Sequence, residues 1–324
     1  MKGGGSNTTT AAVLKERIKE HYNELSPYYH DLWGRHIHHG YWVTGKETKE
    51  EAQVQMMEEL ARRAGLSADK ELKILDVGCG VGGGSIFLAK RFNAHVTGIT
   101  LSPVQAEMAK QIATKENATD LTTFHQLDAE QLQDHILASS SSSDPSQRSS
   151  ITPASSGLNF EAGSFDVIWI SEVLSHLSDR DQFFRNSNRL LRRGGRLALV
   201  GWLKAEGLTP EKEQQYVQPI VEGMLLPSLS TMADYEKMLQ HNGFRVVSFE
   251  DISDRVSKTW DICLDIITNP TLWKLAFTKG GDFIAFLKAF KAMRAGFASK
   301  TFVYGMLVAE KEEEWFCRPL PARF

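Results

Sequence analysis

The chain has 324 residues, of which 42% are hydrophobic and 24% charged, as in an ordinary globular protein with one large or two small domains. Its formal net charge of −3 argues against a nucleic-acid partner, because binding to phosphate backbones usually requires a basic face. The three cysteines, Cys79, Cys263 and Cys317, lie far apart and form no C-x-x-C pair, which predicts neither a disulfide framework nor a metal site and favours a cytoplasmic location.

The N-terminal part of the sequence predicts helices around an aromatic segment. Residues 1–10 are small and polar, and we expect them to be disordered. A helix is predicted from residue 11 that stops before Pro27, followed by an irregular stretch over 30–42 that is rich in His, Tyr and Trp. Residues 48–66 form a second amphipathic helix. The segment lacks a signal-peptide pattern, and no run reaches the roughly 18 apolar residues that span a bilayer, so no stable membrane insertion is expected.

From residue 72 onward, apolar strand segments alternate with helical segments. Strands are predicted over 72–77, 94–99, 121–127, 165–170, 196–203, 245–252 and 301–310. Helices are predicted over 83–92, 102–117, 180–195 and 232–244. This alternation predicts an α/β fold with a doubly wound, Rossmann-like sheet, mostly parallel with an antiparallel last strand, and helices on both faces.

Two segments depart from the alternation. Residues 138–157 are of low complexity, rich in Ser and Pro, and predict a disordered surface insert. Residues 254–300 are helical and aromatic-rich, and they precede the last strand. This second segment predicts a helical cap over a ligand pocket, with additional core packing as the alternative.

The sequence "LDVGCGVGGGS" contains a G-x-G-x-x-G pattern after the first predicted strand, where a doubly wound sheet binds its ligand. The motif alone fits a nicotinamide dinucleotide. However, Asp76 stands two residues before the first glycine, and a carboxylate there repels phosphate but suits an ammonium group. The second strand leads into Thr100, Leu101 and Ser102 without the usual acidic ribose ligand, whereas Asp128 follows the third strand and could accept a hydrogen bond from an adenine amino group.

Four segments together carry a family resemblance: "LDVGCGVGGGS", "GITLSPVQ", "FDVIWISEVLSHLSD" and "LLRRGGRLAL". They resemble class I S-adenosylmethionine-dependent methyltransferases, most closely the group that contains the tocopherol C-methyltransferases. "HIHHGYW" and "FVYGMLVAEK" are also similar to that group, so the resemblance covers most of residues 20–310. We therefore divide the chain into an N-terminal lid segment (residues 1–70), a cofactor-binding core (71–205), the rest of the sheet with the substrate cap (206–311) and a C-terminal tail (312–324).

The resemblance implies S-adenosylmethionine as the cofactor. The residues expected to bind it are Asp76, Gly78, Cys79, Gly80, Gly82, Thr100, Leu101, Gln105, Asp128, Ala129 and Ser171. Some of these assignments have a structural alternative: the glycines form a tight turn without ligand, Asp128 caps a helix, and Gln105 is a solvated helix residue.

On the acceptor side, Glu172 and His176 follow the fourth predicted strand and are the catalytic candidates. Histidine is the natural base near neutral pH, and a positioning or structural role is the alternative. Residues expected in the substrate pocket or its lid are Tyr29, Trp33, His38, His39, Tyr41 and Trp260. No metal is expected, because adjacent His38 and His39 would point apart in an extended chain and lack a Cys or carboxylate at ligand spacing.

These observations predict a methyltransferase that acts on a carbon or nitrogen, with oxygen as the third possibility, of a small, mostly apolar specialised metabolite. One alternative is a non-methylating cyclase or ligand-binding protein on the same fold, because fold does not fix function. A weaker alternative is an NAD(P)-dependent oxidoreductase, which the residues after the second strand and Asp76 disfavour.

Overall fold

The computed structural model describes residues 5–137, 158–266, 268 and 281–312. Its centre is a seven-stranded sheet with the strand order β3-β2-β1-β6-β7-β9-β8. The strands are β1 (Lys73–Val77), β2 (His95–Thr100), β3 (Thr122–Gln126), β6 (Phe165–Ser171), β7 (Leu191–Lys204), β8 (Phe244–Asp251) and β9 (Phe302–Lys311). The first five in this order are mutually parallel, and β9 runs antiparallel between β7 and β8. The predicted α/β fold with an antiparallel last strand is confirmed.

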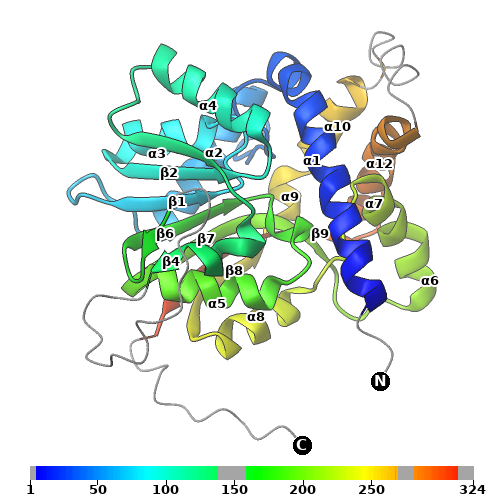
Figure 1. Ribbon diagram of the computed structural model, residues 1–324. Helices are drawn as coiled ribbons and strands as arrows, with labels where there is room; N and C mark the ends of the chain where they lie inside the picture. The colour runs from blue at the N-terminus through cyan, green and yellow to red at the C-terminus, as the bar shows by residue number, and fades with distance from the viewer. Residues whose placement is uncertain (1–4, 138–157, 267, 269–280, 313–324) are drawn as a thin grey trace, which may run out of the picture.

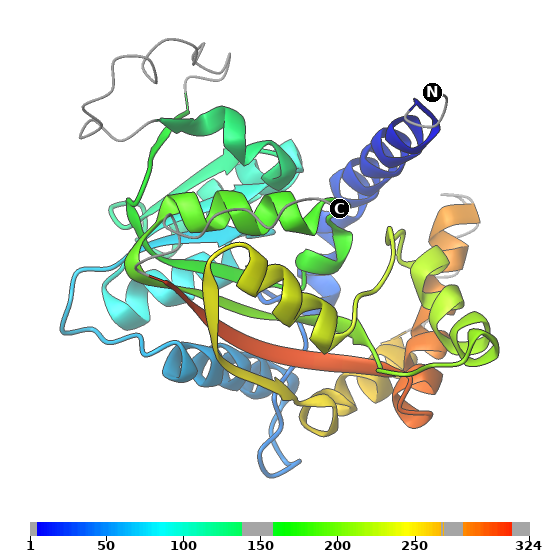
Figure 2. The same ribbon diagram turned by 90° about the horizontal axis from the view of Figure 1, so that it is seen from below.

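Alternate residues of the strands enter two separate hydrophobic cores because successive side chains point to opposite faces of a sheet. Ile74, Val96 and Val167 pack on the face covered by α2 (Lys49–Arg63). Their neighbours Leu75 and Ile168 pack on the other face, covered by α5 (Arg180–Leu190) and α8 (Met232–His241). Figures 1 and 2 show these helices on opposite sides of the sheet, with α3 (Gly83–Phe92) and α4 (Pro103–Lys115) over the β1–β3 half.

The first helix is much longer than the sequence predicts. α1 runs from Gly5 to Trp33, so the expected disorder of residues 5–10 and the expected stop before Pro27 are both wrong. A proline removes one backbone donor and weakens a turn, but packing can outweigh this cost. Here α1 packs against α4, and the Ser26 hydroxyl donates to the Tyr22 carbonyl in the weakened turn.

The boundary between α5 and β7 also differs from the prediction. The helix ends at Leu190 instead of continuing to the two glycines, and β7 begins at Leu191. Leu191 is fully buried and pairs with Phe165 of β6, so sheet pairing and burial outweigh the helical pattern of this stretch. Gly194 then adopts a φ of 66°, which a glycine tolerates.

The predicted helical cap has three described helices, α9 (Ser253–Val256), α10 (Lys258–Ile266) and α12 (Gly281–Ala298). α12 packs against α10 and against α7 (Gln218–Gly223), which follows α6 (Pro210–Lys212) and the π-helix η4 (Glu213–Val217). Figure 1 shows α1, α7, α10 and α12 grouped beside the same end of the sheet. This group of helices closes the space above the carboxyl ends of the central strands.

The predicted Ser-rich insert lies outside the described residues, but the chain on either side of it is held close together. β4 (Ile136–Leu137) pairs with β5 (Phe160–Glu161), and His135 Nδ1 donates to the Leu158 carbonyl at 2.7 Å. We expect that a short Gly/Ser linker in place of residues 139–156 leaves the melting temperature nearly unchanged, because shortening a surface loop costs little. Differential scanning calorimetry tests this expectation, and a large fall in melting temperature would show that the segment packs.

Candidate active site

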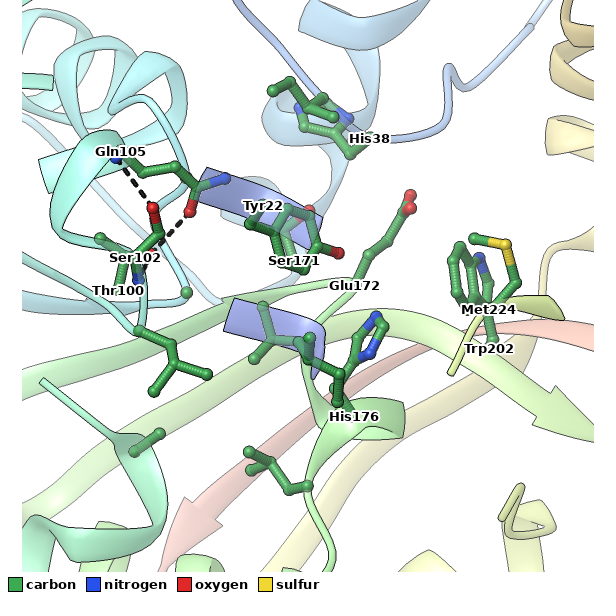
Figure 3. Close-up of a pocket in the computed structure, with 18 of the residues that line it drawn as sticks. Tyr22, His38, Thr100, Ser102, Gln105, Ser171, Glu172, His176, Trp202 and Met224 are labelled. Carbon is green, nitrogen blue, oxygen red and sulfur yellow. Dashed lines mark hydrogen bonds between the residues drawn. The ribbon is translucent and has the colours of Figure 1, made fainter. Parts of the chain in front are cut away.

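A cavity of about 280 Å³ opens where the carboxyl ends of β1, β2, β6 and β7 meet α1 and the cap (Figure 3). It brings together most of the predicted site. The predicted residues that line it are Trp33, His38, His39, Gly78, Gly80, Thr100, Leu101, Gln105, Ala129, Ser171, Glu172, His176 and Trp260.

The glycines after β1 differ in their surroundings. A Cβ on Gly78 would lie 2.1 Å from a methyl group of Val173, so this glycine is needed for packing. Gly80 has a φ of 55° and no described atom within 4 Å of an added Cβ, so its backbone faces open space in the cavity. Gly82 is the N-cap of α3 and does not line the cavity, and a Cβ on it would lie 2.9 Å from both Ala109 and Phe124.

Asp76 lies beneath the glycine loop and not on the cavity wall. Its side chain is 3% exposed and accepts a 2.6 Å hydrogen bond from the Ser85 hydroxyl. Burial raises its pKa to about 6, and the bond from Ser85 offsets part of this effect. Cys79 is also buried away from the cavity wall, and burial raises the pKa of its thiol well above the ordinary value. Direct cofactor contact by these two residues stays a prediction.

The end of β2 forms a polar cluster on the cavity wall. The Thr100 hydroxyl donates to Gln105 Oε1 at 2.7 Å (Figure 3). The Ser102 hydroxyl caps α4 by accepting a hydrogen bond from the backbone N–H of Gln105. Since Gln105 is only 5% exposed, the alternative of a solvated helix residue is wrong. Its side-chain amide nitrogen remains available to donate to a ligand hydroxyl.

At the end of β3, Asp128 serves as a helix N-cap, which was its structural alternative. Its carboxylate accepts from the Glu130 amide at the start of η1 (Ala129–His135) and forms a 2.7 Å ion pair with Lys15 of α1. Lys15 also pairs with Glu130 at 2.6 Å. An adenine amino group at Asp128 would therefore share this carboxylate with Lys15.

The histidine segment, residues 34–42 after α1, is irregular and brings His38 and His39 to the cavity wall. The two rings have different neighbours, and the His39 ring centroid lies 4.7 Å from that of Trp260. His36 and His38 have ring centroids 5.4 Å apart. Tyr41 instead packs beside Arg255 outside the cavity, and the side chain of Tyr29 lies outside the described residues. Within the described part of the chain, no group of His, Cys, Asp or Glu side chains could hold a metal ion.

Glu172 directly follows β6 and is held by three donors. Its Oε1 accepts from the His39 amide at 2.6 Å, from His39 Nδ1 at 2.7 Å and from the Tyr304 hydroxyl at 2.6 Å. Burial alone would raise the pKa of Glu172, but the charge and hydrogen bonds of His39, with the Tyr304 bond, bring it below the ordinary value. Glu172 is therefore ionised at neutral pH.

His176 ends the short helix η3 (Leu174–His176) and lies between aromatic rings. Its ring centroid lies 6.2 Å from that of Tyr22 in α1 and 6.1 Å from that of Trp202 in β7. Neither ring nitrogen has a hydrogen-bond partner among the described residues. Burial lowers its pKa to about 4, so the imidazole is neutral at pH 7. Arg180 donates to the carbonyls of Leu174 and Ser175 and so fixes the turn that carries His176.

Sequence reasoning missed several cavity residues that come from distant segments. They are Lys15, Tyr22, Ser102, Glu130, Trp202, Met224, Thr259, Cys263 and Phe290, with Tyr304 behind Glu172. Ser102 lies in "GITLSPVQ" and Tyr304 in "FVYGMLVAEK", but neither segment pointed to these individual side chains, and the other residues belong to no recognisable motif. The aromatic richness of the 254–300 segment was a signal for the cap as a whole, and not for individual residues.

Comparison with known proteins identifies the family. Residues 75–199 match a methyltransferase domain family. The chain is 31% identical to the chloroplastic tocopherol O-methyltransferase of Arabidopsis thaliana over 82% of this chain and 72% of the relative. The chain belongs to the class I S-adenosylmethionine-dependent methyltransferases. Its cofactor is S-adenosylmethionine, and the open backbone at Gly80 and the polar cluster at Thr100 and Gln105 fit such a ligand.

Solved structures share the fold of this methyltransferase. The [4+2]-cyclase SpnF aligns with a TM-score of 0.72 and 22% identity, covering 92% of this chain and 96% of that one. Geranyl diphosphate C-methyltransferase from Streptomyces coelicolor A3(2), in complex with S-adenosyl-L-homocysteine, aligns with a TM-score of 0.66 and 16% identity, covering 92% and 98%. Among the described helices of this methyltransferase, none is both long and apolar enough to cross a membrane.

Proposed function

We propose that this methyltransferase methylates a nitrogen or carbon atom of a small, mostly apolar specialised metabolite. The observation that carries the proposal is the pairing of aromatic cavity walls with two weak bases. Trp33, Trp202, Trp260 and Phe290 line the cavity, where they would bind an apolar substrate or a developing positive charge. Gly78, Gly80, Thr100, Leu101 and Gln105 would hold the cofactor at the opposite wall, next to Ser171 and Ala129.

When bound, S-adenosylmethionine supplies a methyl group that is already activated on a sulfonium. The methyl carbon would be attacked by a lone pair or π-electron pair of the acceptor, and the electron pair of the broken carbon–sulfur bond would stay on sulfur. The surplus acceptor proton passes to Glu172, to His176 or to water. The protein therefore mainly aligns the two reactants and excludes water, and alignment alone supplies roughly 7–11 kcal/mol of the barrier.

The protonation states of the two candidate bases favour nitrogen or carbon over a hydroxyl oxygen. Both His176, with a pKa of about 4, and Glu172, with a lowered pKa, are weak bases at pH 7. A hydroxyl group must give up its proton during transfer, and a weak base provides little driving force for that step. An amine can arrive neutral, and an electron-rich carbon loses its proton only after the new bond has formed.

The test compares metabolites of a strain with and without the gene, fed methionine with a deuterated methyl group. We expect a small apolar product that carries the three deuterium atoms on nitrogen or carbon in the gene-containing strain only. Labelling on oxygen, as the name of the Arabidopsis relative indicates for that protein, would overturn the assignment of the acceptor atom. Purified protein that binds the cofactor but labels no product would favour the cyclase or ligand-binding alternative.

A further inference from the structure

The Glu172 carboxylate is held by only one of its two oxygens. All three donors, the His39 amide, His39 Nδ1 and the Tyr304 hydroxyl, bind Oε1 at 2.6–2.7 Å. Oε2 has no hydrogen-bond partner among the described residues, and Glu172 lines the cavity. Figure 3 shows its side chain projecting from the end of β6 into the space between His38 and Trp202.

The backbone at Glu172 indicates that this orientation is imposed by the surrounding structure. Its φ of 59° is in the left-handed region, which is strained for a non-glycine residue. Such a conformation persists only where the surroundings determine it, and it is concentrated at functional sites. Here the surroundings are a loop 133 residues earlier in the chain and a strand 132 residues later, which clamp the same oxygen.

We propose that His39 and Tyr304 are positioning residues that hold Glu172 as a carboxylate and aim its Oε2 at the substrate. There Oε2 accepts a hydrogen bond from an N–H or O–H next to, or on, the atom that is methylated. The identity of that atom rests on the proposed function, whereas the clamp on Glu172 does not. Without the clamp, burial beside Trp202 and Trp260 would raise the pKa of the carboxyl group and so favour its protonated form, which presents a donor in place of an acceptor.

The groups that face Glu172 limit what else could control its charge. They come from α1, the histidine segment, η3, α10 and β9, and are Tyr22, His38, His39, His176, Cys263 and Tyr304. Of these, only His39 and Tyr304 donate hydrogen bonds to Glu172. Removal of either donor should therefore move the titration of Glu172 to higher pH.

The test is a carboxyl NMR titration of the full-length protein labelled with ¹³C at glutamate Cδ, with the Glu172 signal assigned from Glu172→Gln. We expect the titration of Glu172 to move up by about one pH unit or more in Tyr304→Phe, which removes only the hydroxyl. Tyr235→Phe is the matched control, because Tyr235 is a buried tyrosine of α8 outside the cavity. An unchanged titration in Tyr304→Phe would overturn the proposal.

A second variant and two further measurements separate failure of the clamp from failure of the proposed function. His39→Leu removes the imidazole donor and should also raise the titration of Glu172, so it replaces Tyr304→Phe if that variant does not fold. Calorimetry with S-adenosylmethionine should show wild-type affinity in Tyr304→Phe. With the acceptor found by deuterium labelling, the acidic limb of kcat/KM should move to higher pH in Tyr304→Phe and not in Tyr235→Phe. If no acceptor is methylated, the NMR titration still decides the role of the clamp.

Discussion

Replacement of Gly80 by valine should weaken S-adenosylmethionine binding by at least about 100-fold, which is about 2.7 kcal/mol. Gly80 has a φ of 55°, and an added side chain would project into the open space of the cavity. This is the space in which the backbone of Gly80 is expected to contact the cofactor. A β-branched residue is also strained at positive φ, by roughly 1–3 kcal/mol. Isothermal titration calorimetry measures the affinity, and thermal denaturation measures the effect on stability.

A control variant at a second glycine separates backbone strain from blocking of the cofactor site. Gly194 has a φ of 66° and no described atom within 4 Å of an added Cβ, but it lies in β7 far from the cavity lining. Gly194→Val should therefore lose stability to a similar extent and keep full cofactor affinity. If Gly80→Val binds the cofactor as wild type does, the glycine loop is only a tight turn, and the cofactor lies elsewhere.

Asp76→Ala tests the same site from beneath the loop. A carboxylate at this position would balance the ammonium group of the cofactor, directly or through water. Because burial raises the pKa of Asp76 to about 6, the unliganded group is protonated below that pH and ionised above it. Affinity in the wild type should therefore fall as pH decreases below about 6, and this pH dependence should vanish in Asp76→Ala along with most of the binding.

The parts of the site that local sequence patterns predict are those in which one strand leads directly into one turn. Gly80 and Glu172 follow strand ends and Thr100 is the last residue of β2, so the parallel sheet places all three at one edge irrespective of distant packing. Tyr304 and Lys15 could not be predicted in this way, because each meets its partner across more than 100 residues of chain. The prediction of where α1 ends was wrong for a related reason. Pro27 is a local stop signal, and packing of α1 against α4 overrides it.

His176→Ala should lower turnover by about 10²–10⁴-fold if His176 accepts the proton of the acceptor, with cofactor affinity nearly intact. Burial lowers the pKa of His176 to about 4, well below the unperturbed value of about 6.5, so its neutral form persists down to mildly acidic pH. Activity that depends on neutral His176 is present above about pH 4 and lost as pH falls through that value. The variant should therefore lack an acidic limb near pH 4 that the wild type shows.

The pH–rate profile of His176→Ala separates a base from a positioning residue. If His176 only shapes the aromatic wall beside Tyr22 and Trp202, turnover falls modestly and the acidic limb remains, set by Glu172 or by the ionisation of the substrate. His135→Gln is the control, because His135 is a buried histidine that does not line the cavity, and its profile should match the wild type. Wild-type turnover with an unchanged profile in His176→Ala would reject the catalytic role. Glu172, whose Oε2 has no hydrogen-bond partner among the described residues and which lines the same cavity, would then be the group that meets the acceptor proton.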